Sequence, residues 1–414
     1  MKNVSHTSED SQTEAALNKN KILEGIRVLD LTRFLSGPQA TLYLAALGAE
    51  VVRIDDPVGG DPTMNTPPFF GPSGVSMERQ TPNDLGIAYL KRARGKKSVA
   101  IDLKNKDGYA LFLRLVQKAD IIVENFRVGV TKRLGIDYTT LRQQNPKLIY
   151  CSITGYGSTG PESELKAYDL MVQASSGLMS ITGEPNGVPY KSGSPISDCI
   201  AGTFALSGVL GALFQRTRTG KGQFIDVSMS DCLVSLVYDE PWDCYEQLDL
   251  AVRQGNRIMR FSPFNTYAAK DGTVAIGAAS QVDWTNLLDL MDRNDLKDNQ
   301  NYMNLSWRIS NNADVDAIVS EWTKSLPVAT ILKRCVERQI ACSPIREAQD
   351  LATWKHLEHR QMLTPAFHPD LPHIKGPLAP SFPLKFSNAN TGYQIPSAHL
   401  GEHNKSILQA WLDE

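Results

Sequence analysis

The sequence predicts an α/β protein with a large doubly wound domain and a smaller α+β domain. Short apolar runs alternate with amphipathic segments of helical spacing through the first half of the chain. The strand-like runs are apolar on both faces, which is typical of a parallel sheet covered by helices on both sides. Near residue 255 this alternation gives way to a hairpin followed by helices, which indicates a second domain.

The first half supplies the elements of the large domain, which we place at residues 21–230. Strands are expected at 26–31, 51–54, 98–103, 121–124 and 148–154, and helices at 39–47 and 107–118. A long helix from Asp198 to about Arg218 and a strand at 224–229 follow. The pattern is Rossmann-like, but the turn at 32–38 lacks GxGxxG, so a dinucleotide cofactor is unsupported.

The remaining segments are predicted to be a small domain, two linkers and a terminal extension. Runs at 264–269 and 273–278 flank a Lys-Asp-Gly turn, and helices at 315–325 and 328–338 complete a small α+β domain at 255–345. Residues 231–254 are expected to be a linker. Residues 346–414, Pro-rich between 365 and 383, are expected to return to and complete the large domain. Residues 1–20 are polar and predict a disordered extension.

Bulk composition favours a cytoplasmic enzyme over a nucleic-acid or membrane protein. The formal net charge is −2 for 414 residues, which argues against a polyanionic partner. No apolar run approaches the ~18 residues that a membrane-spanning helix needs, and no signal-peptide pattern is seen. The six cysteines lack metal-site spacing, so no metal is expected.

Histidine placement narrows the chemistry. The chain has seven histidines, and none lies between residues 7 and 355. The large domain therefore has no imidazole base of its own, which excludes Ser-His-Asp, Cys-His and His-metal chemistry unless the C-terminal segment supplies the histidine.

Two acidic residues, Asp169 and Asp198, stand at the starts of apolar helices. Either each is a helix cap, or each is an anion stabilised by the helix N-terminus and available to attack an electrophile. The helix after Asp198 carries a stripe of small residues that includes Gly202 and Gly208. Close helix packing is the favoured explanation of that stripe, and a bound ligand is the alternative.

Basic residues cluster at 91–97, either as a solvated loop or as a phosphate site. Lys104, Arg133 and Lys166 are further phosphate candidates.

The chain resembles the class III CoA-transferases, a superfamily that includes formyl-CoA transferase, carnitine CoA-transferase and α-methylacyl-CoA racemase. The resemblance covers nearly everything from Leu23 to Leu412, and no single motif carries it alone. The matching motifs are GIRVLDLT at 25–32, SGP at 36–38, LGAEVVRI at 47–54, KKS at 96–98, DLK at 102–104, VENF at 123–126, TGYG at 154–157, SD at 197–198, TGKGQ at 219–223 and GEH at 401–403.

The resemblance implies that Asp198 is the nucleophile. Its carboxylate would attack an acyl-CoA to give a mixed anhydride and then an aspartyl-CoA thioester, which a carboxylate acceptor displaces. Asp169 and Leu35 would support the reaction. The implied CoA-binding residues are Phe34, Ser36, Lys104, Asn125, Phe126, Arg133 and Lys166, with Lys96 a weaker candidate. Coenzyme A thioester is then a substrate, no cofactor is tightly bound, and the protein is an interlocked homodimer.

Departures from the family pattern bear on the substrate. Leu35 replaces a glutamine of the formyl-CoA transferases, and the family's glycine-rich lid is shortened to about Gly255-Asn256. Tyr168 replaces the histidine base of the racemases, which disfavours the alternative of an acyl-CoA racemase or isomerase. A non-catalytic acyl-CoA-binding relative is disfavoured by the intact Asp198. The donor is expected to be succinyl-CoA or another dicarboxylyl-CoA, with Arg33 or Arg94 facing the second carboxylate.

Overall fold

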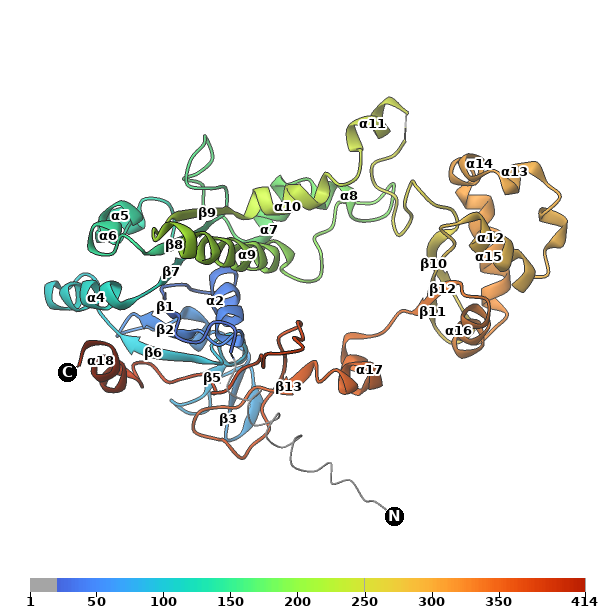
Figure 1. Ribbon diagram of the computed structural model, residues 1–414. Helices are drawn as coiled ribbons and strands as arrows, with labels where there is room; N and C mark the ends of the chain where they lie inside the picture. Colours follow the sequence, from blue (N-terminus) through green and yellow to red (C-terminus); the bar gives the residue numbers. More distant parts are fainter. Residues whose placement is uncertain (1–20, 249, 414) are drawn as a thin grey trace, which may run out of the picture. The chain divides into compact units, whose positions relative to one another are not determined.

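The computed structural model describes residues 21–248 and 250–413, and these divide into two compact units (Figure 1). The first unit holds the chain up to Leu178, residues 191–240 and the segment from Lys355 onward. The second unit holds Met179–Tyr190 and Pro241–Trp354. The expected extension at 1–20 lies outside the described residues.

A six-stranded parallel sheet forms the centre of the first unit, in the order β6-β2-β1-β7-β8-β9 (Figure 1). Its strands are β1 (Arg27–Asp30), β2 (Glu50–Asp55), β6 (Lys96–Ala100), β7 (Ile121–Glu124), β8 (Ile149–Thr154) and β9 (Phe224–Ser228). Strand order reverses between β1 and β7, and such a switch point leaves a crevice at the carboxyl ends of the strands. The predicted α/β class and parallel sheet are confirmed.

Helices cover both faces of this sheet, because its strands are apolar on both sides. One hydrophobic core includes residues of α2 (Ser36–Ala46), α9 (Ile196–Thr219) and α10 (Met229–Val237). The opposite core includes residues of α4 (Lys106–Lys118), α6 (Tyr138–Gln144) and α18 (Asn404–Leu412). The other helices of the first unit are η1 (Pro62–Asn65), α3 (Ile87–Arg92), α5 (Val130–Leu134), α7 (Asp169–Ser175) and α17 (Lys355–His359).

Helix α9 packs closely on α2, as its small residues predicted. A Cβ added at Gly202 would lie 2.8 Å from the Ser36 carbonyl oxygen, and one at Gly208 would lie 3.1 Å from Ile225. Close packing therefore explains both glycines.

By length and composition alone, α9 is also apolar enough to cross a membrane. The expectation that no segment reaches that length is wrong, because small residues such as Gly202 and Ala205 extend the apolar stretch without standing out in the sequence. A buried core helix passes the same criterion, and Ala201, Ala205 and Val209 are buried in the first core.

Some segments expected to be linkers contain regular structure. Residues 231–254 include most of α10 and all of α11 (Trp242–Gln247), and Cys232 and Leu233 of α10 join the core. The C-terminal segment pairs β13 (Leu363–Pro365) with β14 (Leu378–Pro380) and ends in α18. A small sheet of β3 (Phe69–Gly71), β4 (Gly74–Ser76) and β5 (Leu85–Gly86) was not predicted.

The second unit has its own core between an antiparallel sheet and helices. The sheet joins β10 (Phe264–Ala268), β11 (Thr273–Gly277) and β12 (Ala341–Pro344), so the predicted hairpin is present. The helices are α8 (Leu178–Ile181), which starts at the boundary between the units, α11, α12 (Gln281–Leu290), η2 (Asn294–Leu296), α13 (Gln300–Met303), α14 (Leu305–Ser310), α15 (Asn312–Lys324), α16 (Val328–Glu337) and η3 (Ala348–Thr353).

Candidate active site

A cavity of about 830 Å³ opens at the switch point between β1 and β7. Its volume is within the range of about 300–1,000 Å³ that is usual for small-molecule sites. The loops after β1 and β7 contribute residues such as Arg33, Phe34, Asn125 and Phe126, and α7 and α9 contribute Asp169 and Asp198. All of these residues belong to the first unit.

The loop between β1 and α2 is held in one conformation by Asn125. The side-chain amide of Asn125 accepts a hydrogen bond from Arg33 N at 2.8 Å and donates one to Arg33 O at 2.8 Å. The next residue, Phe34, has φ of +66°, which is strained for a bulky side chain. Asn125 thus positions the wall of the cavity as well as lining it.

Asp198 lies in the first turn of α9, where Pro195 is the N-cap residue, so Asp198 is not a cap. Burial, and after it the nearby Asp169 carboxylate, raise the pKa of the Asp198 carboxyl, while Ser36 and Arg92 lower it, and the net pKa is about 6. A carboxyl group with this pKa is mainly ionised at neutral pH, yet its negative charge is only partly balanced by nearby hydrogen-bond donors and positive charges. That combination suits a nucleophile.

Asp169 is also not the cap of its own helix, whose N-cap residue is Tyr168. Its carboxylate reaches across to the start of α9 and accepts hydrogen bonds from Ser197 N at 3.0 Å and Ser197 Oγ at 2.7 Å. Its other oxygen accepts a bond from Gln173 Nε2 at 2.6 Å. Asp169 therefore fixes the turn that carries Asp198 and adds negative charge beside it.

Most of the residues predicted for this site line the cavity, namely Phe34, Ser36, Lys104, Asn125, Phe126, Lys166, Asp169 and Asp198. Leu35 and Arg133 are not among the lining residues: Leu35 is the N-cap residue of α2, and Arg133 lies in α5. Lys104 and Lys166 are exposed and provide positive charge at the cavity. They suit the phosphates of a nucleotide-containing ligand.

Lys96, the weaker CoA candidate, belongs to a buried polar network instead. Its side chain is 1% exposed, and its Nζ donates to Asp30 Oδ2 at 3.0 Å, Thr41 Oγ1 at 2.7 Å and Pro38 O at 2.8 Å. The ammonium has three donors, and these three acceptors satisfy them all. Lys96 therefore stabilises the fold, and the expectation that it holds CoA is wrong.

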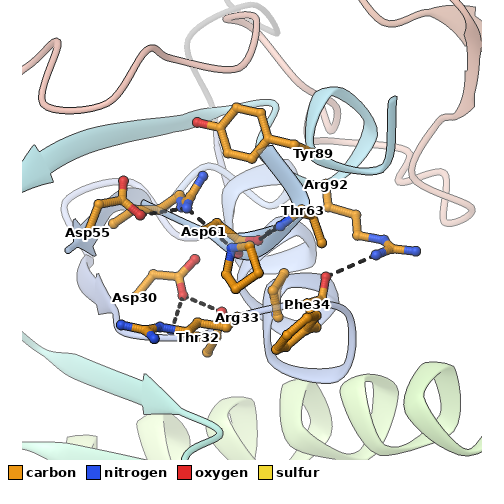
Figure 2. A network of polar contacts seen from close by, with 12 residues as sticks. Asp30, Thr32, Arg33, Phe34, Asp55, Asp61, Thr63, Tyr89 and Arg92 are labelled. Carbon is orange, nitrogen blue, oxygen red and sulfur yellow. Dashed lines mark hydrogen bonds and ion pairs between the residues drawn. The ribbon is translucent and has the colours of Figure 1, made fainter. Parts of the chain in front are cut away.

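The rest of this network lies at the neighbouring strand ends (Figure 2). Arg53 donates to Asp55 at 2.6 Å and lies 3.8 Å from Asp61, and its guanidinium stacks on the Tyr89 ring. Every charge in this group has a partner of opposite sign.

Two further basic residues of 91–97, Arg94 and Lys97, also have structural contacts. Arg94 is 4% exposed and donates to Lys91 O and Pro380 O, so it does not line the cavity. Lys97 pairs with Glu50 at 2.6 Å. The side chains of Arg94, Lys96 and Lys97 contact residues of the C-terminal segment, β1 and β2, respectively. These three residues therefore form neither a solvated loop nor a phosphate site.

Arg92 is not among the cavity-lining residues, but it contacts one of them, Phe34, and the sequence did not single it out. It lies at the end of α3, its Nη1 donates to Phe34 O at 3.0 Å, and its charge stabilises the Asp198 anion (Figure 2). Arg92 belongs to the basic run at 91–97, but the spacing of the residues does not distinguish its role from that of the other cations in the run.

Within residues 21–248 and 250–413, no group of three or more His, Cys, Asp or Glu side chains could hold a metal ion.

The doubly wound fold, with a weakly compensated carboxylate in a cavity at its switch point, is that of an α/β enzyme that acts on a small-molecule substrate. The model of CoA-transferase family III matches residues 23–404, so the chain belongs to that family and is a CoA-transferase.

Proteins of known activity in this family are similar along most of the chain. The succinate–glutarate CoA-transferase of Agrobacterium fabrum is 33% identical over 394 residues, which cover 94% of this chain and 96% of that one. The succinyl-CoA:mesaconate CoA-transferase of Haloarcula hispanica is 34% identical over 84% of this chain and 86% of its own. A CAIB/BAIF family protein from Brucella suis has a solved structure with a TM-score of 0.80 and 31% identity, covering 95% of this chain and 100% of that one.

Proposed function

We propose that this CoA-transferase moves CoA from succinyl-CoA, or another dicarboxylyl-CoA, to a carboxylate acceptor with Asp198 as the nucleophile. The observation that carries the proposal is the raised pKa of a cavity-lining carboxylate at the switch point of the sheet. The relatives named for succinate, glutarate and mesaconate support the substrate class.

The reaction would proceed through two covalent intermediates. A carboxylate oxygen of Asp198 attacks the thioester carbonyl and expels CoA thiolate, which leaves an acyl-aspartyl anhydride. The thiolate then attacks the aspartyl carbonyl, so that the donor acid leaves and an aspartyl-CoA thioester remains. The acceptor carboxylate repeats these steps in reverse, and Asp198 is regenerated. Because each intermediate stays activated, the energy of the thioester is conserved so long as water is excluded.

The cavity has charges that suit the two ends of the substrate. Lys104 and Lys166 would meet the CoA phosphates, while Phe34, Phe126 and Asn125 would border the pantetheine arm and thioester. CoA is then a substrate bound and released in each cycle, with no tightly bound cofactor.

We further propose that the protein works in the cytoplasm as an interlocked homodimer, without nucleic acid or membrane. Phe204 and Phe214 of α9 and Leu236 of α10 are between 44% and 65% exposed, and α9 and α10 pack on each other, so these elements present exposed apolar side chains of the kind found at interfaces. A second copy of the chain would cover them.

A panel assay tests the function. The purified protein is incubated with succinyl-CoA or acetyl-CoA, deuterated at the α-carbon, and with a series of mono- and dicarboxylates. We expect CoA to appear on a dicarboxylate acceptor with the α-deuterium retained. Loss of α-deuterium without transfer would instead indicate racemase or isomerase chemistry.

A further inference from the structure

Arg92 has a cationic group that the described residues do not neutralise. Its side chain is partly buried, and its one hydrogen bond in the described structure is from Nη1 to the Phe34 carbonyl oxygen. No carboxylate of the described residues lies within 4 Å of it, whereas Arg53 nearby has two such partners. A guanidinium has five N–H donors in a planar fork that matches a carboxylate.

A partly buried guanidinium without an ion-pair partner lowers the stability of the folded protein unless another group balances its charge. Burial lowers the pKa of Arg92, and the Asp198 anion only partly offsets that effect. Buried or half-buried charges in proteins are usually paired or hydrogen-bonded. Within the described residues, Arg92 has only the Phe34 carbonyl in this role.

The position of Arg92 is fixed relative to the nucleophile by one short loop. Arg92 contacts the carbonyl of Phe34, and Ser36, two residues later, is close enough to Asp198 to lower its pKa. Two peptide units span at most about 7 Å between Cα atoms. The contact of Arg92 and the residue beside Asp198 therefore lie on the same short stretch of the loop that forms one wall of the cavity.

We propose that Arg92 binds the carboxylate of the substrate that does not react, and so selects dicarboxylates over monocarboxylates. This inference rests on the proposed function and names the residue that sets its substrate class. Of the two arginines expected from the sequence to take this role, Arg94 is buried with its guanidinium on backbone carbonyls. Arg33 stacks on Phe126, 5.5 Å from the ring centre, in the part of the cavity assigned to CoA.

The test compares two acceptors of equal chain length, glutarate and valerate, with succinyl-CoA as the common donor. The variants are Arg92→Met and Arg92→Lys, and Arg142→Met, on the exposed side of α6, is the control for loss of an arginine. Because the acceptor reacts with the same aspartyl-CoA enzyme in every assay, its kcat/KM does not depend on donor binding. At pH 8.5 Asp198 is ionised in all variants, so loss of the Arg92 charge does not act through the protonation of the nucleophile.

For Arg92→Met we expect the glutarate-to-valerate ratio of kcat/KM to fall about 10- to 100-fold, as for loss of one charge-assisted bidentate contact. The ratio for Arg92→Lys should lie between those of Arg92→Met and the wild type, and Arg142→Met should leave the ratio unchanged. An equal loss for both acceptors, with a normal thermal unfolding curve, would overturn the inference. Absence of transfer by the wild type to any acceptor would instead refute the proposed function.

Discussion

Two acidic groups of the first unit, the buried Asp30 and the half-buried Asp198, lie near the carboxyl ends of parallel strands and differ in how far nearby positive charges and hydrogen-bond donors balance their negative charge. Burial alone would raise the pKa of Asp30, but Lys96, Arg53 and the hydroxyls of Thr32 and Thr41 outweigh it and hold the pKa below its usual value. Burial also raises the pKa of Asp198, and there Asp169 adds to the effect, so that Ser36 and Arg92 leave it at about 6.

The difference shows how one domain holds both a rigid support and a reactive group. Around Asp30 each charge contacts an opposite charge, so the network resists change and anchors β1, β2 and β6 to α2. Around Asp198 the negative charge of Asp169 has a larger effect on the pKa than the positive charge of Arg92, and Arg92 forms no ion pair with Asp198, so the carboxylate keeps its reactivity. A partner at contact distance makes a buried carboxylate structural, and the lack of one leaves it available for chemistry.

Replacing the uncompensated carboxylate should have the largest effect on activity. We expect Asp198→Asn to reduce transfer at least about a thousandfold, because an amide cannot form the anhydride. The control is Asp314→Asn, which also removes an acid from the first turn of a helix, α15, but one that is exposed to solvent. It should keep full activity, and similar losses in both variants would contradict the role of Asp198.

The same variant should make the protein more stable at neutral pH. The folded-state pKa of Asp198 is raised, so the native state is favoured below the unfolded pKa of 3.8 and loses that advantage as pH rises through about 6. Removing the charge should recover about 1–3 kcal/mol at pH 8 and nothing at pH 3. Urea unfolding at both pH values measures this, and destabilisation at pH 8 would show that Asp198 is compensated after all.

Breaking the buried ion pair between Asp30 and Lys96 should instead destabilise the protein. Lys96→Met leaves Asp30 buried without its cation and should lower the free energy of unfolding by about 3–5 kcal/mol. The neighbouring Lys97→Met removes a pair with Glu50 that is about one-third exposed, and should cost less than about 1 kcal/mol. The double variant Asp30→Leu with Lys96→Met should regain most of the loss. Equal losses of stability in Lys96→Met and Lys97→Met would contradict the claim that the ion pair of Asp30 with Lys96 stabilises the fold.

The pH profile should report the state of Asp198. Because the carboxylate is the attacking form, kcat/KM should rise about tenfold per pH unit below 6 and level off above it. Stopped assays from pH 4.5 to 8.5 would reveal this limb. A profile that is flat down to pH 5 would mean that the nucleophile has an ordinary pKa.

A smaller shift should follow from Asp169→Asn. The amide oxygen can still accept the hydrogen bond from Ser197 N, but the negative charge beside Asp198 is lost. The acid limb of the pH profile should therefore move to lower pH by less than about one unit. A limb that moves upward, or stays in place, would show that Asp169 does not set the charge state of Asp198.

The sequence predicted those parts of the fold that depend on local pattern. The strands at 27–30, 50–55, 121–124 and 149–154 are apolar and short, and the helices between them have a helical period, so each could be read from its own residues. The helices within 231–254 were missed because α10 and α11 are short and adjoin turn-forming residues.

Side-chain partners from distant parts of the chain were not predictable in the same way. Lys96 stands in a basic run and would be taken for a surface or phosphate-binding residue, but its partner Asp30 lies 66 residues earlier. Asp169 contacts the helix that begins 27 residues later instead of capping its own. Arg92 differs from the neighbouring cations by its hydrogen bond to the carbonyl of Phe34, which lies 58 residues earlier and is not visible in the sequence.

The central claim, that Asp198 is the uncompensated carboxylate that carries CoA, is tested most directly by mass spectrometry of a trapped intermediate. The protein is mixed with succinyl-CoA without acceptor, quenched in acid and digested. We expect the peptide containing Asp198 to gain the mass of CoA less water, and to lose it when glutarate is added before the quench. A protein that turns over succinyl-CoA and glutarate while CoA is found on another residue, or on none, would contradict the account.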